Sequence, residues 1–214
     1  MRRILMLAMA WAPLAACTDI ISPPRVEPYE HRFFIPDGDK TLTLAFHWPR
    51  RSMPIRVYLA PDSPLRPAAL RAMGIWENAV LYGEIRFELV DEPPDADIVI
   101  RNERIDKLES TLRLAASADG CIGETVFDAD LDEGRLTGPF ETYVWTTSGT
   151  SETLPACYDI VVLHEFGHAL GILNHSPDAG DLMAINPVRN TPTERDIATI
   201  EAVYHLPATL RPAR

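Results

Sequence analysis

Basic residues are scarce in this sequence. Lys and Arg total 20 among 214 residues, against 31 Asp and Glu, so the formal net charge is −11. Proteins that bind nucleic acids need clustered Lys and Arg to contact the phosphates. We therefore expect no nucleic-acid partner.

Long apolar runs and internal repeats are also lacking. No motif recurs at the spacing of about 20 to 50 residues that is typical of solenoids and propellers. The apolar stretch at residues 4–16 is shorter than the roughly 20 residues that a transmembrane helix needs. Hydrophobic residues make up 46% of the chain, which is ordinary for a globular protein. We expect one domain with a sizeable core, acting as a monomer.

The first residues predict export. Residues 1–16 begin with a basic pair and continue as an apolar run, as secretory signals do. Residues 14–17 (LAAC) resemble the lipobox of bacterial lipoproteins, in which the signal is cut before a Cys that then carries lipid. The resemblance implies a signal peptide at 1–16 and a lipidated Cys17 that anchors the protein to a bacterial envelope membrane, the outer membrane in a Gram-negative cell. The alternative is a plain signal cut after residues 10–12 (AWA), which would give a secreted protein.

Cysteine is rare as well, with three in the chain. If Cys17 carries the lipid, Cys121 and Cys157 remain as an even pair in an exported protein, where disulfides form. A bridge between them would stabilise the domain by about 3–4 kcal/mol, because it restricts the unfolded chain. Two buried free thiols are the alternative.

The rest of the chain predicts a single α+β domain. Residues 17–50 are rich in proline and charge and predict a tether that leads to a domain at 51–214. Apolar patterns within that domain predict strands and helices. The expected strands are 54–59, 85–90, 98–101, 124–127 and 141–145, and the expected helices are 64–82, 153–173 and one that runs from Thr191 to about Tyr204.

Two of these helices carry more detailed predictions. The first should direct a stripe of apolar residues at the core: Leu70, Met73, Trp76 and Val80. The last should begin with Thr191 as N-cap, Pro192 in the first turn and Glu194 completing a capping box. Its inward residues should be Ile197, Ile200 and Val203.

Residues 164–175 (HEFGHALGILNH) carry the clearest chemical pattern. On a helix, residues i and i+4 lie about 6 Å apart along the axis and on one face, so His164 and His168 can bind one Zn²⁺. Glu165 would then lie over the open coordination position. Three protein ligands plus water is the catalytic arrangement of zinc. Two packing histidines on an apolar helix are the alternative.

A third ligand requires the helix to end. On a continuing helix, His175 would lie about 10 Å beyond His168, too far to share a metal ion. Gly171 can adopt the left-handed conformation that terminates a helix. We therefore predict a helix end between Gly171 and Asn174.

This segment resembles the metzincin signature HExxHxxGxxH followed by a Met-turn, and it is most similar to the matrixins (matrix metalloproteinases). The signature would place the third His at position 174, where this chain has Asn, and His175 comes one residue later. The interval from His175 to Leu182 and Met183 favours one inserted residue. Asn174 is the alternative ligand, but a neutral amide oxygen is a poor zinc donor beside imidazole.

The resemblance covers roughly residues 50–206. It implies a metzincin-like single domain with a mixed twisted sheet, an active-site helix and a C-terminal helix. It also implies a zinc-dependent endopeptidase with one catalytic Zn²⁺. The site residues it implies are the metal ligands His164, His168 and His175, the general base Glu165, and Met183 beneath the metal.

The substrate that the resemblance implies is an extended protein or peptide. Strand addition would place it along an edge strand of the sheet, for which residues 124–127 are the candidate. The segment after Met183 would line the pocket for the side chain that follows the cut bond. Three other functions fit the same metal ligands: a zinc-dependent amidase for a small substrate, a zinc-binding module without turnover, and a structural lipoprotein with an incidental metal.

A second cation site is a weaker hypothesis. Residues 127–134 are acidic and could bind Ca²⁺, which prefers carboxylates. The EF-hand pattern fails because Pro139 stands at its twelfth position, and a solvated acidic loop is the alternative. His31, His47 and His205 are isolated in the sequence, and we expect them to be surface or packing residues.

Overall fold

The computed structural model of the protein describes residues 26–80, 82–105, 110, 112–148 and 153–213. The predicted signal peptide and Cys17 lie outside these residues. In the described part of the chain, no helix combines the length and apolar character needed to cross a bilayer.

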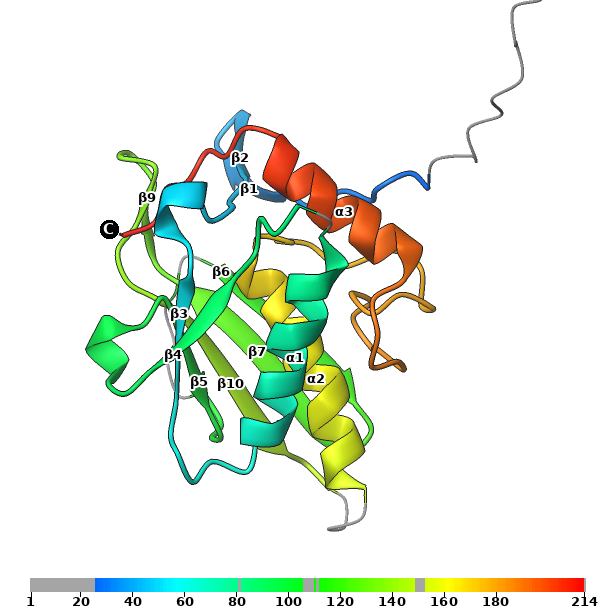
Figure 1. Ribbon diagram of the computed structural model, residues 1–214. Helices are drawn as coiled ribbons and strands as arrows, with labels where there is room; N and C mark the ends of the chain where they lie inside the picture. Colours follow the sequence, from blue (N-terminus) through cyan, green and yellow to red (C-terminus); the bar gives the residue numbers. More distant parts are fainter. Residues whose placement is uncertain (1–25, 81, 106–109, 111, 149–152, 214) are drawn as a thin grey trace, which may run out of the picture.

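A six-stranded mixed sheet forms the centre of the fold (Figure 1). Four neighbouring strands are parallel, and the last two run antiparallel to their neighbours. The order across the sheet is β4 (Phe87–Val90), β3 (Ile55–Leu59), β5 (Ile98–Arg101), β10 (Phe140–Thr146), β7 (Cys121–Phe127) and β6 (Leu112–Ala118).

Helices α1 (Arg66–Ala79) and α2 (Leu154–Ala169) lie side by side against one face of this sheet (Figure 1). Helix α3 (Glu194–His205) follows the long segment after α2. Two hairpins and two short 3₁₀ turns complete the described elements. They are β1 (Phe33–Asp37) with β2 (Lys40–Leu44), β8 (Ala129–Asp130) with β9 (Arg135–Leu136), η1 (Arg50–Ser52) and η2 (Pro93–Asp95).

These elements confirm the predicted α+β class. The strand expected at 98–101 is found at those residues, and that expected at 54–59 begins one residue later. Strand β6 was not predicted, because its sequence LRLAASA contains only two large apolar residues. Its alternating burial shows that it still presents one face to the core, since Leu112, Leu114, Ala116 and Ala118 are all buried.

The assignment of residues 124–127 to an edge strand is wrong. Strand β7 lies between β10 and β6 and pairs antiparallel with both. The outer position belongs to β6, which the turn at Asp119 and Gly120 folds back onto β7. Strand β6, which the sequence pattern did not predict, therefore covers the edge of β7 that was expected to be free.

The tether predicted at residues 17–50 is wrong from Tyr29 onward. Tyr29, Leu44, Phe46 and Trp48 are all buried. The indole N–H of Trp48 donates to the carbonyl oxygen of Ala169, at the end of α2, over 2.9 Å. Prolines and charges separate these apolar residues, so no periodic pattern marks them, yet each packs against the core.

Two details of the helices also differ from prediction. Leu70 is 47% exposed, because it lies about 120° around the axis of α1 from the fully buried Trp76. In α3 the N-cap is Thr193, whose side chain accepts from the backbone N–H of Asp196, while Asp196 completes the capping box. The residue spacing of a capping box occurs at 191–194 and again at 193–196. The structure forms the second of these boxes.

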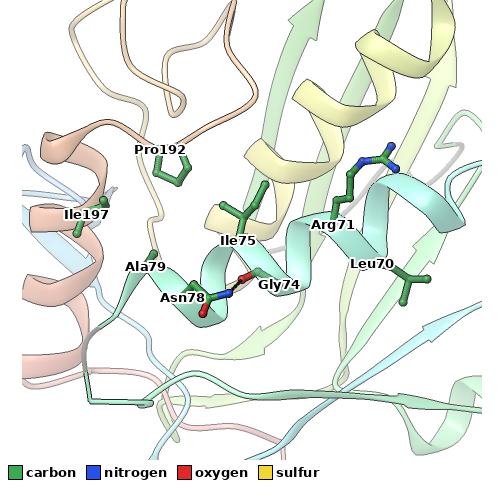
Figure 2. A pocket seen from close by; sticks show the side chains of 8 residues that line it. All are labelled: Leu70, Arg71, Gly74, Ile75, Asn78, Ala79, Pro192 and Ile197. Carbon is green, nitrogen blue, oxygen red and sulfur yellow. Dashed lines mark hydrogen bonds between the residues drawn. The ribbon is translucent and has the colours of Figure 1, made fainter.

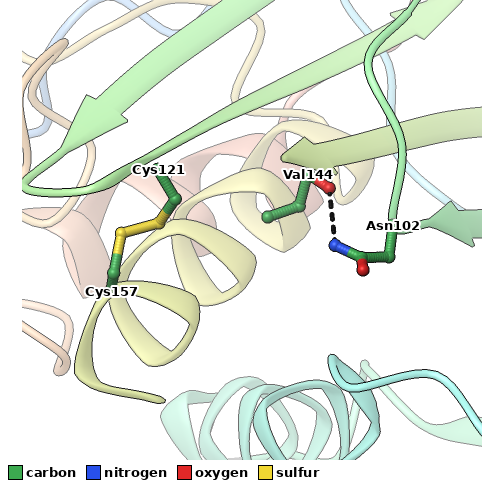
Figure 3. The surroundings of a disulfide bond; sticks show 4 residues. All are labelled: Asn102, Cys121, Val144 and Cys157. Carbon is green, nitrogen blue, oxygen red and sulfur yellow. Dashed lines mark hydrogen bonds between the residues drawn. A yellow bond between two sulfur atoms is a disulfide. The ribbon is translucent and has the colours of Figure 1, made fainter. Parts of the chain in front are cut away.

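The predicted disulfide between Cys121 and Cys157 is confirmed (Figure 3). Its Cα atoms are 6.1 Å apart. Cys121 is the first residue of β7 and Cys157 lies in the first turn of α2. The bridge therefore attaches β7 to the helix that carries the histidine pattern.

Candidate metal centre

Three histidine rings converge at the end of α2. The Nε2 atoms of His164 and His168 are 2.9 Å apart, and that of His175 lies 3.3 Å from that of His168. In the part of the chain that the structure describes, this is the only group of three or more His, Cys, Asp or Glu side chains arranged to hold a metal ion. The helix thus brings the first two rings together as its periodicity requires, and the following turn adds the third.

That turn depends on Gly171. Helix α2 ends at Ala169, two residues before the earliest predicted end, and Gly171 has φ of +116°. A Cβ atom at this position would lie 2.1 Å from the carbonyl oxygen of Phe46. Gly171 is therefore required both by its left-handed conformation and by the close approach of another segment.

Asn174 and His175 take different places in this turn. The side-chain oxygen of Asn174 accepts a hydrogen bond from the backbone N–H of His175 over 2.9 Å. The ring of His175, in contrast, faces the other two histidines. The ring of His175 therefore belongs to the histidine group, whereas the side-chain oxygen of Asn174 is hydrogen-bonded within the turn.

Backbone carbonyls orient the two helical rings. The Nδ1 atom of His164 lies 2.8 Å from the oxygen of Leu182, and that of His168 lies 2.6 Å from the oxygen of Ile172. Each carbonyl can accept a hydrogen bond only from an Nδ1–H, which leaves the lone pair of Nε2 directed at the centre of the group. Burial and the neighbouring His175 lower the pKa of His164 to about 3, so this ring is neutral at pH 7, as a metal ligand must be.

This donor set fits zinc. Two nitrogens bound to one tetrahedral zinc at about 2.0–2.1 Å lie roughly 3.3 Å from each other. The Nε2 separations of 2.9 Å for His164–His168 and 3.3 Å for His168–His175 are close to that value, and all three ligand atoms lie within 4.8 Å of one another. Imidazole is also a ligand that zinc favours, and three such ligands leave a fourth position for water or substrate.

Glu165, the residue after His164 in α2, is fully buried. Neither of its carboxylate oxygens has a hydrogen-bond partner. A Cβ atom added to Gly123 in β7 would lie 2.6 Å from one of these oxygens, so the carboxylate packs directly against that strand. Burial raises the pKa of Glu165 well above its usual value.

Met183 forms the apolar floor under α2. It is fully buried, and a Cβ atom on Gly167 would lie 2.4 Å from its sulfur and 3.2 Å from the ring of Trp76. The indole N–H of Trp76 donates to the carbonyl of Leu163, just before the first histidine. Gly167 therefore allows the helix to approach both side chains closely.

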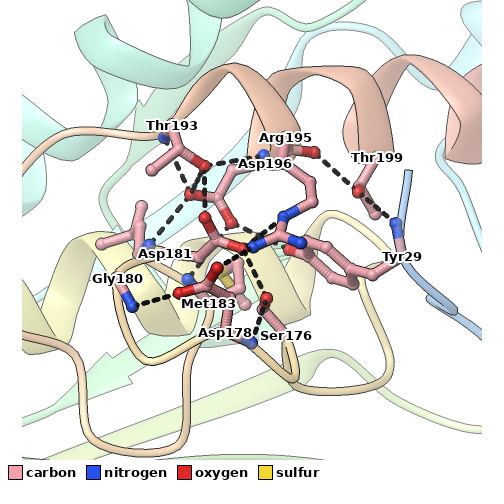
Figure 4. Close-up of polar contacts among 11 residues, drawn as sticks. Tyr29, Ser176, Asp178, Gly180, Asp181, Met183, Thr193, Arg195, Asp196 and Thr199 are labelled. Atoms are coloured by element: carbon pink, nitrogen blue, oxygen red, sulfur yellow. Dashed lines mark hydrogen bonds and ion pairs between the residues drawn. The ribbon is translucent and has the colours of Figure 1, made fainter. Parts of the chain in front are cut away.

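Two buried carboxylates hold the segment that contains Met183 (Figure 4). Asp196 accepts hydrogen bonds from the backbone N–H groups of Leu182 and Met183 and from the hydroxyl of Tyr29. Burial and the charge of Asp196 raise the pKa of Tyr29, which keeps this hydroxyl protonated as a donor. This cluster cannot be recognised from local sequence, because its members lie far apart in the chain.

Asp181 forms the second part of the same cluster (Figure 4). It accepts from the hydroxyls of Ser176 and Thr193 and from the guanidinium of Arg195. Ser176 directly follows His175, and its backbone N–H donates to the carbonyl of Met183 over 2.8 Å. The cluster therefore connects the N-terminus of α3 to the turn that carries the third histidine ring. The only local signal for it was the capping-box spacing of Thr193 and Asp196.

The remaining predicted candidates lie elsewhere. His31 is buried, His47 packs beside the ring of Tyr204, and His205 is exposed beside Glu84. In the acidic loop, Asp130 accepts from the backbone N–H of Glu133. Its carboxylates form no metal-binding group among the described residues.

An apolar groove of 540 Å³ runs along α1 (Figure 2). Most of its lining residues come from that helix, and Pro192 and Ile197 close the other side. None of the three histidines, nor Glu165, lines it. The groove therefore carries no part of the candidate metal centre.

Comparison with known proteins gives one family. The family model described as Matrixin matches residues 57–205, which include the histidine group, the Met183 segment and α3. No curated protein matches the chain.

Proposed function

The chain belongs to the matrixin family of metallopeptidases, and from that premise we propose that it is a zinc-dependent endopeptidase acting on extended protein or peptide substrates. The observation that carries the proposal is the convergence of three histidine nitrogens at the end of α2, where the residue next to His164 has a buried carboxylate whose oxygens have no hydrogen-bond partner. His164, His168 and His175 would hold the ion, and Glu165 would act beside it as the general base.

In this proposal, bound zinc, Glu165 and two backbone carbonyls have different roles in hydrolysis. Zinc, when bound, would polarise the scissile carbonyl and lower the pKa of a water molecule. Glu165 would accept a proton from the attacking water and deliver it to the leaving nitrogen. A carboxylate in this role must accept the proton from water before it donates it to the leaving nitrogen. The carbonyls of Leu182 and Ile172 keep the ligand rings in place while this happens.

The test uses the chain from residue 18 onward, purified with zinc and incubated with a proteome-derived peptide library. The blank is Glu165→Gln, which keeps the shape of the side chain and removes its basicity. The matched control is Glu194→Gln, an exposed carboxyl in the first turn of α3. Cuts made by the wild type and the control, and absent from the blank, would support an endopeptidase.

Failure would take a specific form. If zinc binds stoichiometrically and no peptide is cut, either by the wild type or by the Ser117→Pro variant described below, the proposal is wrong. A small-substrate amidase would then be sought with short acyl amides, and a zinc-binding module without turnover would be left if these also resist. Zinc content, measured on the same samples, separates this outcome from simple loss of the metal.

We also propose that Cys17 anchors the exported protein to a bacterial envelope membrane. The support is the sequence LAAC at residues 14–17, after a basic and apolar start. Cys17→Ser should move the protein from the membrane fraction to the soluble fraction and abolish incorporation of a labelled fatty acid. Unchanged fractionation and labelling would contradict the anchor.

A further inference from the structure

Strand β6 runs directly beside the candidate metal centre. It pairs antiparallel with β7 over its whole length, and Ala116 is the partner of Gly123. Gly123 is the residue against which the Glu165 carboxylate packs. Strand β6 therefore lies on the outer edge of the strand against which the proposed general base packs, and β10 occupies the other edge.

The other side of β6 is also occupied. The backbone N–H of Ser117 donates to the carbonyl oxygen of Ile185 over 3.2 Å. Ile185 lies two residues after Met183, in the segment expected to line the pocket for a substrate side chain. Helix α2, which carries two of the three histidines, also packs against β6. Strand β6 is thus held between β7 and the segment after Met183.

The burial of the centre agrees with this arrangement. His164, Glu165 and His168 have no exposed surface. A peptide that adds to a sheet needs an edge whose backbone N–H and C=O groups have no strand partner. The edge of β7 beside Glu165 has one already, because β6 fills it. A substrate strand and β6 cannot occupy this place together.

We propose that β6 is an internal inhibitory strand, which takes the place of the substrate peptide between β7 and Ile185 and must leave it before the site can act. This inference rests on the proposed endopeptidase function. A substrate would replace β6 in the same antiparallel arrangement on β7. The protein would therefore have two forms. In the closed form β6 is paired with β7, as in this structure, and in the open form β6 has left and a peptide can bind.

The way in which the two strands are held supports this division of roles. The disulfide attaches Cys121, the first residue of β7, to α2, so the strand that would receive the peptide is fixed to the helix of the metal centre. Strand β6 is held by backbone pairing, by the Arg113–Glu124 ion pair and by packing of two leucines and two alanines. Alanine side chains bury little apolar area, so displacing β6 costs less than displacing a strand of large residues.

The first experiment locks β6 in place. Ser117→Cys combined with Ile185→Cys places two thiols on segments whose backbones are already hydrogen-bonded, and both positions are exposed. When the new disulfide is formed, kcat/KM for a peptide should fall by about tenfold or more, because the open form is no longer populated. Mild reduction should restore it. Each single Cys variant, treated in the same way, is the matched control and shows any effect on the native disulfide.

A second readout on the same samples does not depend on peptidase activity. The rate at which a chelator removes bound zinc reports access to the centre. The locked protein should release zinc about tenfold more slowly than the single variants, because the chelator can enter only from the open form. Equal release rates, together with equal kcat/KM, would overturn the inference.

The second experiment loosens β6. Ser117→Pro removes the N–H that binds Ile185, whereas Ser117→Ala keeps it and removes only the hydroxyl. The proline variant should have a several-fold higher kcat/KM and faster zinc release, and the alanine variant should match the wild type. Proline and alanine variants that behave alike in both assays would contradict the inference. Absence of peptide cleavage in every variant with zinc bound would contradict the proposed function instead, and zinc release from the locked protein would still decide the role of β6.

Discussion

The carboxylate of Asp196 accepts a hydrogen bond of 2.9 Å from the backbone N–H of Leu182. The carbonyl of the same Leu182 faces Nδ1 of His164 at 2.8 Å. One residue therefore connects the N-terminus of α3 with the ring of the first proposed ligand. Because Asp196 is fully buried, a change at this carboxylate should affect both stability and the orientation of that ring.

Asp196→Asn should destabilise the protein by about 2–4 kcal/mol, because the amide nitrogen cannot accept a hydrogen bond and leaves buried donors unsatisfied. Zinc affinity should fall by about tenfold through the loss of support for His164. Urea denaturation and a competitive zinc titration measure the two effects. Glu194→Gln, in the same turn of α3 but exposed, should change neither. Wild-type zinc affinity in the Asn variant would show that the ring is oriented without this contact.

Gly167→Ala should destabilise the protein by about 1–3 kcal/mol, although alanine is the better helix former, because the new methyl group would overlap the sulfur of Met183. Gly74→Ala is the matched control, since Gly74 also lies inside a helix and has nothing within 4 Å of the added Cβ. That variant should be stabilised by about 0.5–1 kcal/mol. Thermal denaturation of both proteins tests the contrast, and changes of the same sign would refute it.

Removal of the disulfide by Cys121→Ser with Cys157→Ser should lower the free energy of unfolding by about 4 kcal/mol. The estimate follows from closure of a loop with a sequence separation of 36 residues. Denaturant unfolding measures the loss, and reduction of the wild-type protein should reproduce it. A loss of less than about 1 kcal/mol would mean that the bridge restricts the unfolded chain only slightly.

The metal-free protein should become less stable as the pH falls from 7 to 5. Burial lowers the pKa of His164, His168 and His175 below the ordinary value of 6.5, so in this range the unfolded chain binds protons that the folded chain does not. Their contribution to stability is complete above pH 6.5 and is lost as the pH falls below it. Glu165 acts in the opposite direction, because burial raises its pKa above 4.5 and its contribution improves on acidification. The loss of stability from the three histidines exceeds the gain from Glu165, because three groups act in one direction and one group acts in the other.

The slope should therefore be positive, about 1–3 kcal/mol per pH unit between pH 5 and 6.5. Denaturation midpoints of the chelator-treated protein across this range measure it. His164→Gln should reduce the slope, because it removes one of the three rings whose pKa is lowered by burial. A flat profile would show that the three rings do not resist protonation in the folded state.

The chemistry of the site could be predicted from local sequence, whereas its enclosure could not. His164 and His168 lie four residues apart on one helix, so their proximity follows from the helix itself. The turn at Gly171 is equally local, and its position was found within two residues. Strand β6 was missed because burial of Ala116 and Ala118 depends on what lies opposite them and not on their own hydrophobicity.

The buried carboxylates illustrate the same limit. Thr191 with Glu194 and Thr193 with Asp196 present the same capping-box spacing, and local rules do not distinguish them. Asp196 is used because its carboxylate also binds backbone groups of the segment that contains Met183. That contact joins residues 13 and 14 positions apart in the chain and requires the intervening loop to fold back.

Local sequence was enough to identify the three histidines, the neighbouring glutamate, the glycine that ends their helix and the cysteine pair. Each follows from residue type and spacing over a few positions, where backbone geometry leaves few choices. The three-dimensional arrangement was needed to show which strand covers β7, which carboxylate binds the segment that contains Met183, and that Tyr29, Leu44, Phe46 and Trp48 belong to the core. Those outcomes depend on pairing and packing between distant segments, whose free energies are known only once all the competing partners are in place.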